Sequence, residues 1–136
     1  MKIFICASKH NYSHIPQVKS ELEAKWHLIT LPNSFDDPFA EYKVMESSPK
    51  EHIKWKQDML RLQADKVSDN DAILVMNFEK NWQPNYIWWA TFLEVYEAFR
   101  QGKKIFFYNP LPEGMIYDEL VGINPKVINS NLDLII

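Results

Sequence analysis

Glycine and cysteine are scarce in this chain. Only three of its 136 residues are glycine, fewer than its five tryptophans, whereas average glycine usage is about 7%. The single cysteine, Cys6, excludes an internal disulfide, which fits the reducing cytoplasm. Its place in an apolar run predicts a small buried side chain. We therefore expect a cytoplasmic protein that folds without covalent cross-links.

An excess of positive charge, a long apolar run and a metal-ligand pattern are missing as well. The net charge is −3, so the chain lacks the excess of basic residues that is typical of nucleic-acid-binding proteins. No apolar run approaches the roughly 20 residues that cross a bilayer, and Met1 leads directly into an apolar segment without a signal-peptide pattern. The four histidines show no metal-binding spacing. We expect a small-molecule ligand and no nucleic acid, membrane, metal or cofactor.

Hydrophobic residues make up 46% of the chain, enough for a core in a domain of this length. Short apolar runs alternate with helical patterns, which predicts a mostly parallel sheet covered on both faces. We expect one domain, residues 1–136, with a flavodoxin/Rossmann-like three-layer α/β fold and strand order 2-1-3-4-5. The expected strands are residues 2–7, 27–31, 72–76, 103–108 and 125–129. The expected helices are residues 14–25, 48–67, 91–101 and 115–121, with a helix or loop at 41–45.

Ligands of open α/β sheets bind at the carboxyl ends of the strands, where the strand order reverses. In the expected order, the first and third strands flank that point. Polar or small residues that follow these strands should border one crevice: Ala7, Ser8, Asn77, Asn85, Tyr86 and Glu94. In the loop after the second strand, Asp36 and Asp37 could bind sugar hydroxyls or act as an acid, or could instead form a turn before Pro38.

Among these candidates, Glu94 is the one whose side chain could act as a nucleophile. Thr91 and Glu94 have the T-x-x-E spacing of a helix capping box, so Glu94 could be purely structural. Alternatively, its carboxylate points into the crevice, where we expect the helix N-terminus to keep it ionised at neutral pH. An ionised carboxylate in a crevice suits nucleophilic attack on a sugar carbon.

The segment Thr91-Phe92-Leu93-Glu94, followed by Gly102-Lys103, resembles the nucleoside 2-deoxyribosyltransferase-like family. That family has a G-[ST]-x-x-E segment, a helix, and a G-K pair before the next strand. The resemblance implies that Glu94 is the nucleophile, that a covalent glycosyl-enzyme forms, and that no cofactor takes part. It also implies cleavage of an N-glycosidic bond or deoxyribosyl transfer, in a homodimer or larger assembly whose pockets are completed across an interface.

The chain departs from the family pattern at three positions. Ala90 stands where glycine is usual, Trp88 where an acid is frequent, and Phe4 where tyrosine is frequent. No general acid carries over, so Tyr86 and Asn85 are candidates only from their place in the loop. The substrate-binding residues that we expect around this helix start are Trp88, Trp89, Ala90 and Thr91.

Two other functions are compatible with the same residues. The chain could bind a nucleotide or related metabolite without turning it over, which the missing acid at Trp88 favours. It could also be a small α/β protein whose own tryptophans fill the crevice, with Glu94 serving only as a cap.

The tryptophans lie where glycine would be expected. Trp26 follows a predicted helix, where a left-handed glycine is usual. Trp82 follows Asn81 in a predicted turn, where Asn-Gly is the common pair. Trp88 and Trp89 lie where the backbone should approach the substrate closely. We hypothesise that these four, but not Trp55, come from UGA codons that some bacterial lineages read as glycine; alternatively, Trp88 and Trp89 form a stacking platform for a base.

Overall fold

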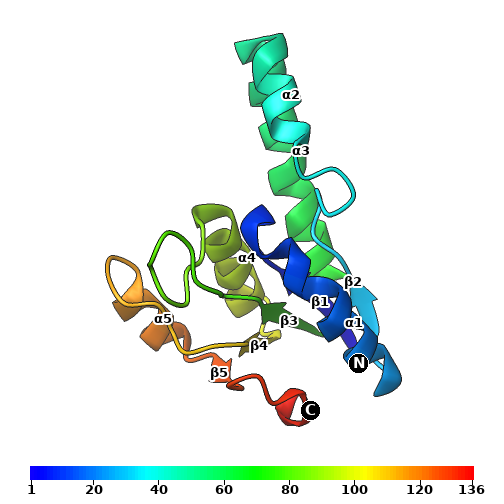
Figure 1. The fold of residues 1–136 in the computed structure, drawn as a ribbon, viewed down its shortest axis with the longest axis vertical. Helices are drawn as coiled ribbons and strands as arrows, with labels where there is room; N and C mark the ends of the chain where they lie inside the picture. The colour runs from blue at the N-terminus through cyan, green and yellow to red at the C-terminus, as the bar shows by residue number, and fades with distance from the viewer.

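A computed structural model describes residues 1–136 as one five-stranded parallel sheet with helices on both faces (Figure 1). The strand order is β2-β1-β3-β4-β5, as the alternating apolar segments predict. All four strand pairs are parallel, so the sheet contains no antiparallel strand. The strands are β1 (Lys2–Cys6), β2 (Leu28–Thr30), β3 (Ala72–Val75), β4 (Lys104–Phe107) and β5 (Lys126–Val127).

The central strands are apolar on both sides because helices cover both faces of the sheet. All four residues of β3 are buried, as are residues 3–6 of β1. Cys6 lies at the end of β1, fully buried and unpaired, as its apolar surroundings predict. Strands β1 and β3 are neighbours, with Cys6 opposite Val75. The chain therefore leaves both strands at the same edge of the sheet.

Different helices cover the two faces. On one face, α1 (Ile15–Ala24) packs Ile15, Val18 and Leu22 against the sheet. On the other face lie α3 (Pro49–Ser68), α4 (Trp89–Arg100) and α5 (Tyr117–Ile123), which contribute Val67, Val95, Ala98 and Leu120 to a second cluster. The apolar C-terminal tail closes the first face, since Leu132 and Ile135 belong to its core. These two side chains of the tail therefore pack on the core.

Helix α2 (Ala40–Ser47) and the first half of α3 extend beyond the rest of the fold as a hairpin (Figure 1). The sequence Ser48-Pro49-Lys50-Glu51 begins α3 as expected, with Pro49 in the first turn. Ser48 is the N-cap, and its hydroxyl accepts a hydrogen bond from the Glu51 N–H at 3.1 Å. None of the helices combines the length and apolar character that a membrane span needs.

Several element boundaries differ from those predicted. Residues Lys9–His14, expected to be a polar loop, form a short 3-10 helix before α1. Helix α5 continues through Gly122 and ends at Ile123, and its C-cap Asn124 takes the left-handed conformation with φ 56°. Asparagine tolerates this conformation because its short side chain can hydrogen-bond locally. Helix α4 begins at Trp89, two residues before Thr91, which changes the interpretation of Glu94.

Candidate active site at the carboxyl ends of the strands

A crevice of about 600 Å³ opens where the chain leaves β1 and β2. Its walls come from the segment after β1, the loop after β2, helices α2 and α3, and the start of α4. Six of the predicted site residues line it: Ala7, Ser8, Trp88, Ala90, Thr91 and Glu94. The crevice is open, and Trp55 and Trp88 lie in its walls, which does not favour the alternative in which tryptophans of the chain fill it.

Glu94 is not a helix cap. The N-cap of α4 is Trp88, and no side chain caps this helix start. Thr91 is the third helical residue and Glu94 the sixth, so Glu94 lies in the second turn, where backbone N–H groups already have intrahelical partners. The capping-box interpretation of Thr91 and Glu94 is therefore wrong. Glu94 is a carboxyl on the buried face of α4 that lines the crevice.

Burial dominates the electrostatics of Glu94, whose side chain is 7% exposed. Desolvation raises its pKa from 4.5 to about 8, while the Cys6 thiol and the Lys66 ammonium oppose that rise. The expectation that the helix N-terminus keeps Glu94 ionised at neutral pH is thus wrong, because the residue lies beyond the first turn, where the dipole acts. At neutral pH most Glu94 side chains carry a proton until a ligand or a pH change removes it.

Two buried polar atoms beside the crevice have no hydrogen-bond partner within the protein. They are Ser8 Oγ and Asn33 Oδ1, and both residues line the crevice. The Asn33 amide nitrogen donates to the Met59 carbonyl at 3.0 Å, which fixes the side chain on α3. Buried polar groups in native structures nearly always have partners, so these two atoms are suited to bind a polar ligand. Asn33 was not predicted from the sequence, although it lies only three residues beyond the end of β2.

Tyr12 is a second lining residue that the sequence analysis missed. Its ring packs against Phe35, with centroids 5.7 Å apart. Burial, and then the charge of Glu94, raise the pKa of the Tyr12 phenol to about 12. The phenol therefore keeps its proton and serves as a hydrogen-bond donor near Glu94. No local motif marked it, because it comes from the 3-10 helix that was expected to be a loop.

Basic side chains gather on one side of the crevice. Lys9, His10 and Lys80 all line it. Partial burial, followed by the charges of Lys80 and Lys9, holds the pKa of His10 below its usual value of 6.5. The lysine ammonium groups lie over aromatic rings, that of Lys9 3.5 Å from the Tyr42 centroid and that of Lys80 4.8 Å from the Tyr86 centroid. This side of the crevice is suited to an anion.

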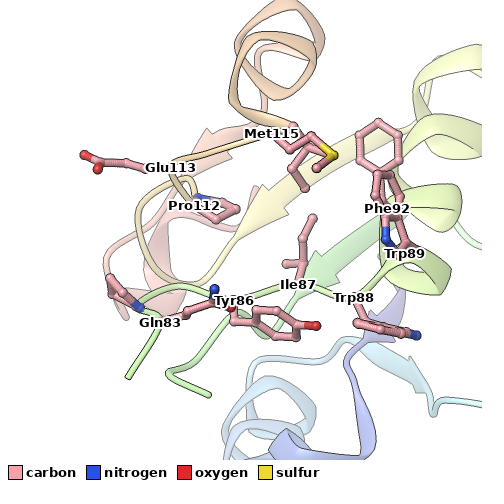
Figure 2. Close-up of a pocket in the computed structure, with 11 residues that line it drawn as sticks. Gln83, Tyr86, Ile87, Trp88, Trp89, Phe92, Pro112, Glu113 and Met115 are labelled. Atoms are coloured by element: carbon pink, nitrogen blue, oxygen red, sulfur yellow. The ribbon is translucent and has the colours of Figure 1, made fainter. Parts of the chain in front are cut away.

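A second hollow, of about 430 Å³, lies on the other side of Trp88. Figure 2 shows it between the loop before α4 and the loop after β4, with Tyr86, Trp88, Trp89 and Phe92 on one side and Met115 opposite. The Trp89 and Phe92 rings meet edge to face at 6.2 Å. Tyr86 and Trp89 line only this hollow, whereas Trp88 borders both.

The remaining predicted residues lie outside both hollows. Asn77 is fully buried, and its side chain donates to the carbonyls of Asn109 and Pro110 at 3.1 and 2.8 Å. Asp36 and Asp37 are exposed, and Asp37 forms an ion pair with Lys43 at 3.1 Å. Asn85 is a partly buried loop residue with φ 58°.

Among the solved structures with a similar fold are two enzymes of nucleoside chemistry. The 2-deoxyribosyltransferase from Bacillus psychrosaccharolyticus superposes with a TM-score of 0.68 at 15% identity, over 99% of this chain and 94% of that one. The chain has the 2-deoxyribosyltransferase fold. The CMP N-glycosidase of Clostridium botulinum shares this fold with a TM-score of 0.53 at 18% identity, over 94% of this chain and 86% of that one.

Sequence comparison adds nothing to this. No protein-family model matches the chain, and no curated protein matches it by sequence. At these identities the likeness to the 2-deoxyribosyltransferase fold concerns architecture, and a fold alone does not determine function. The function must therefore be argued from the crevice itself.

Proposed function

We propose that the chain cleaves the N-glycosidic bond of a nucleotide or nucleoside, or transfers its deoxyribosyl group, with Glu94 as the nucleophile. The observation that carries this proposal is the position of Glu94: a buried carboxyl that caps no helix and lines an open crevice. The architecture, shared with a deoxyribosyltransferase and a CMP N-glycosidase, supports the same chemistry.

The proposed reaction has two steps. In the first, an ionised Glu94 oxygen attacks the anomeric carbon, the carbon–nitrogen bond breaks, and the base leaves with the bonding electron pair and takes up a proton from water. In the second, water or another base attacks the same carbon, and Glu94 leaves as a carboxylate. Glu94 supplies the electron pair in the first step and accepts it back in the second, so no oxidant or reductant takes part.

The polar lining supports a sugar between Glu94 and the loops after β1 and β2. Ser8 Oγ can bind one sugar hydroxyl, and Asn33 Oδ1 can accept a hydrogen bond from another. Tyr12 remains protonated, so it can donate to an oxygen near Glu94. These three residues are held by β1, the 3-10 helix and α3, and the hydroxyls of a bound sugar would satisfy atoms that otherwise lack partners.

The cations at one side of the crevice favour a nucleoside monophosphate over a nucleoside. Lys9 and Lys80 flank His10 closely enough to lower the pKa of its imidazole. A phosphate bound among the three would offset that repulsion and form charge-assisted hydrogen bonds. We therefore propose a 5′-phosphate on the substrate, bound by Lys9, His10 and Lys80.

Binding without turnover is the second candidate. The observation that favours it is the pKa of Glu94, about 8, because a protonated carboxyl is a poor nucleophile. A module that only binds a nucleotide would use the same crevice and the same cations. It would differ in releasing no base.

The experiment is to incubate the protein with a panel of deoxynucleosides and deoxynucleoside monophosphates at pH 7 and pH 9, and to follow free base by chromatography. We expect base release, and its loss in Glu94→Gln. Glu97→Gln is the matched control, because Glu97 is one turn away on the same helix and accepts a hydrogen bond from Gln101 outside the crevice. If the Glu94→Gln variant still releases base, Glu94 is not the nucleophile. If the wild-type protein binds a nucleotide but releases no base, the chain is a binding module.

A further inference from the structure

Helix α4 ends with a glycine in the left-handed conformation. Gly102 has φ 67°, and its N–H donates to the Phe99 carbonyl at 3.1 Å. The next N–H, of Lys103, reaches back to the Ala98 carbonyl at 2.9 Å. This pair of bonds defines the Schellman motif, whose left-handed position is usually glycine. A Cβ added at Gly102 would meet no atom within 4 Å, so backbone conformation and not space favours glycine there.

Helix α1 ends with the same motif, but the left-handed residue is a tryptophan. Trp26 has φ 68°, and its N–H donates to the Glu23 carbonyl at 3.0 Å. The next N–H, of His27, reaches the Leu22 carbonyl at 3.1 Å. Trp26 therefore has the backbone role of Gly102, with φ values one degree apart. A large L residue in this conformation is a genuine outlier.

Trp82 is in the same situation in a different turn. Asn81 and Trp82 have φ 50° and 66°, and Lys80 and Gln83 exchange backbone hydrogen bonds of 3.0 and 2.9 Å across them. Positive φ at both central residues of a two-residue turn is the type I′ pattern, for which Asn-Gly is strongly preferred. The sequence has the asparagine of that pair and a tryptophan in place of the glycine.

Neither tryptophan gains packing in return for its backbone strain. Trp26 is 91% exposed and Trp82 is 92% exposed. A buried aromatic residue can offset unfavourable backbone geometry by removing apolar surface from water, but these two indoles lie in solvent. Both positions therefore have a backbone conformation that favours glycine, and in neither does the side chain pack against the protein.

We propose that positions 26, 82, 88 and 89 carry glycine in the protein as its own cell makes it, encoded by UGA codons that this cell reads as glycine. The backbone carries the argument at 26 and 82. Positions 88 and 89 are included on a different ground: they form a pair of half-exposed indoles at a helix start beside the crevice, where close approach of the backbone to a ligand favours glycine. The change would raise the glycine count from three to seven.

Trp55 is a genuine tryptophan under this proposal. It lies within α3, far from either end of that helix, where glycine is unfavourable relative to most other residues. Its side chain lines the crevice, and the Lys56 ammonium lies 5.8 Å from its ring centroid. Trp55 thus has a helical backbone and a packing role, neither of which Trp26 or Trp82 has.

The proposal changes the shape of the site. Trp88 borders both hollows, and Trp89 forms part of the smaller one (Figure 2). Glycine at both positions removes the indole that separates the two hollows and joins them into one longer crevice at the start of α4. Backbone N–H groups at this helix start would then be open to a ligand. The inference itself rests on backbone geometry and does not depend on the proposed function.

The decisive observation is the codon at each of the five tryptophan positions, together with mass spectrometry of peptides from the protein purified from its own cells. We expect UGA at 26, 82, 88 and 89, UGG at 55, and peptides with the mass of glycine at the four positions. UGG at 26 and 82, or peptides with the mass of tryptophan there, would overturn the proposal.

A stability measurement on recombinant protein tests the backbone argument separately. Trp26→Gly and Trp82→Gly should each raise the midpoint of thermal unfolding, and each should be more stable than the matching alanine variant, Trp26→Ala or Trp82→Ala. Alanine removes the indole but keeps the Cβ, so an advantage of glycine over alanine reports the positive φ. Trp55→Gly should lower the midpoint. Glycine variants no more stable than the alanine variants at both positions would contradict the argument.

Discussion

The Cys6 thiol at the end of β1 and the Glu94 carboxyl in the second turn of α4 are buried neighbours: burial raises the pKa of both groups, and the thiol opposes that rise at Glu94. Neither element could place the carboxyl alone. Strand β1 brings the thiol to the edge of the sheet, and the buried face of α4 brings the carboxyl over it. The contact stabilises the ionised form of Glu94 and so opposes the effect of burial on its pKa.

Base release should depend on pH through Glu94. Its pKa of about 8 means that the ionised fraction increases as the pH rises through that value. We expect kcat/KM for base release to increase between pH 6 and 9, with a midpoint near 8, as measured in overlapping buffers. Cys6→Ala removes a contact that lowers this pKa, so its midpoint should move to higher pH. A wild-type profile that is flat over this range would contradict the assignment.

Stability should show the opposite trend. The folded pKa of Glu94 lies above its ordinary value of 4.5, so its contribution is fully present below pH 4.5 and is lost as the pH rises through about 8. At about 1.4 kcal/mol per pKa unit, the loss is on the order of 5 kcal/mol. Urea unfolding at a series of pH values should show it in the wild type and in Glu97→Gln. Glu94→Gln should lack it; an unchanged pH dependence in this variant would contradict the burial argument.

The cations should discriminate nucleotides from nucleosides. Lys9→Ala and Lys80→Ala each remove a charge that acts on His10, and we expect KM for a nucleoside monophosphate to rise by roughly tenfold, the effect of losing one charged hydrogen bond. KM for the corresponding nucleoside should change little. Inorganic phosphate should raise the pKa of His10, measured by NMR titration. Equal effects on nucleotide and nucleoside would contradict the phosphate site.

We propose that the protein forms a homodimer or a larger assembly through the outer face of α4. Leu93, Tyr96 and Phe99 follow one another at helical spacing, and each is nearly half exposed. An apolar stripe of this kind is typical of a protein interface. Light scattering should show an assembly in the wild type and in the control Gln101→Lys, and a monomer in Leu93→Lys. A monomeric wild type would contradict the proposal.

The strand order could be predicted from the sequence because the core strands are short apolar runs separated by helical patterns. Ala72–Val75 is such a run, and the Ser48-Pro49 helix start is equally local in origin. The left-handed positions at Trp26 and Trp82 were also predictable, since turn and helix-end patterns depend on a few neighbouring residues.

The site was less predictable because it depends on contacts between distant segments. The pattern at Thr91 and Glu94 indicated a cap, but α4 begins two residues earlier, and only tertiary packing determines that start. Burial of Glu94, which raises its pKa, likewise comes from β1 and α3. Asn33 is fixed by the Met59 carbonyl, 26 residues away, and Asn77 is directed to the loop after β4 by bonds to Asn109 and Pro110.

The most direct test of the nucleophile is to detect the covalent intermediate. The protein is mixed with a deoxynucleoside monophosphate at pH 8–9, quenched in acid within the first turnover, digested and analysed by mass spectrometry. Versions with tryptophan and with glycine at 88 and 89 are both used, so that an effect of the two indoles on substrate access is not mistaken for absent chemistry. We predict that the α4 peptide carries a phosphorylated deoxyribosyl group, bound through its anomeric carbon to the Glu94 carboxylate as an ester. This adduct should be absent in Glu94→Gln. If either version releases base but shows no adduct on Glu94, the account is contradicted.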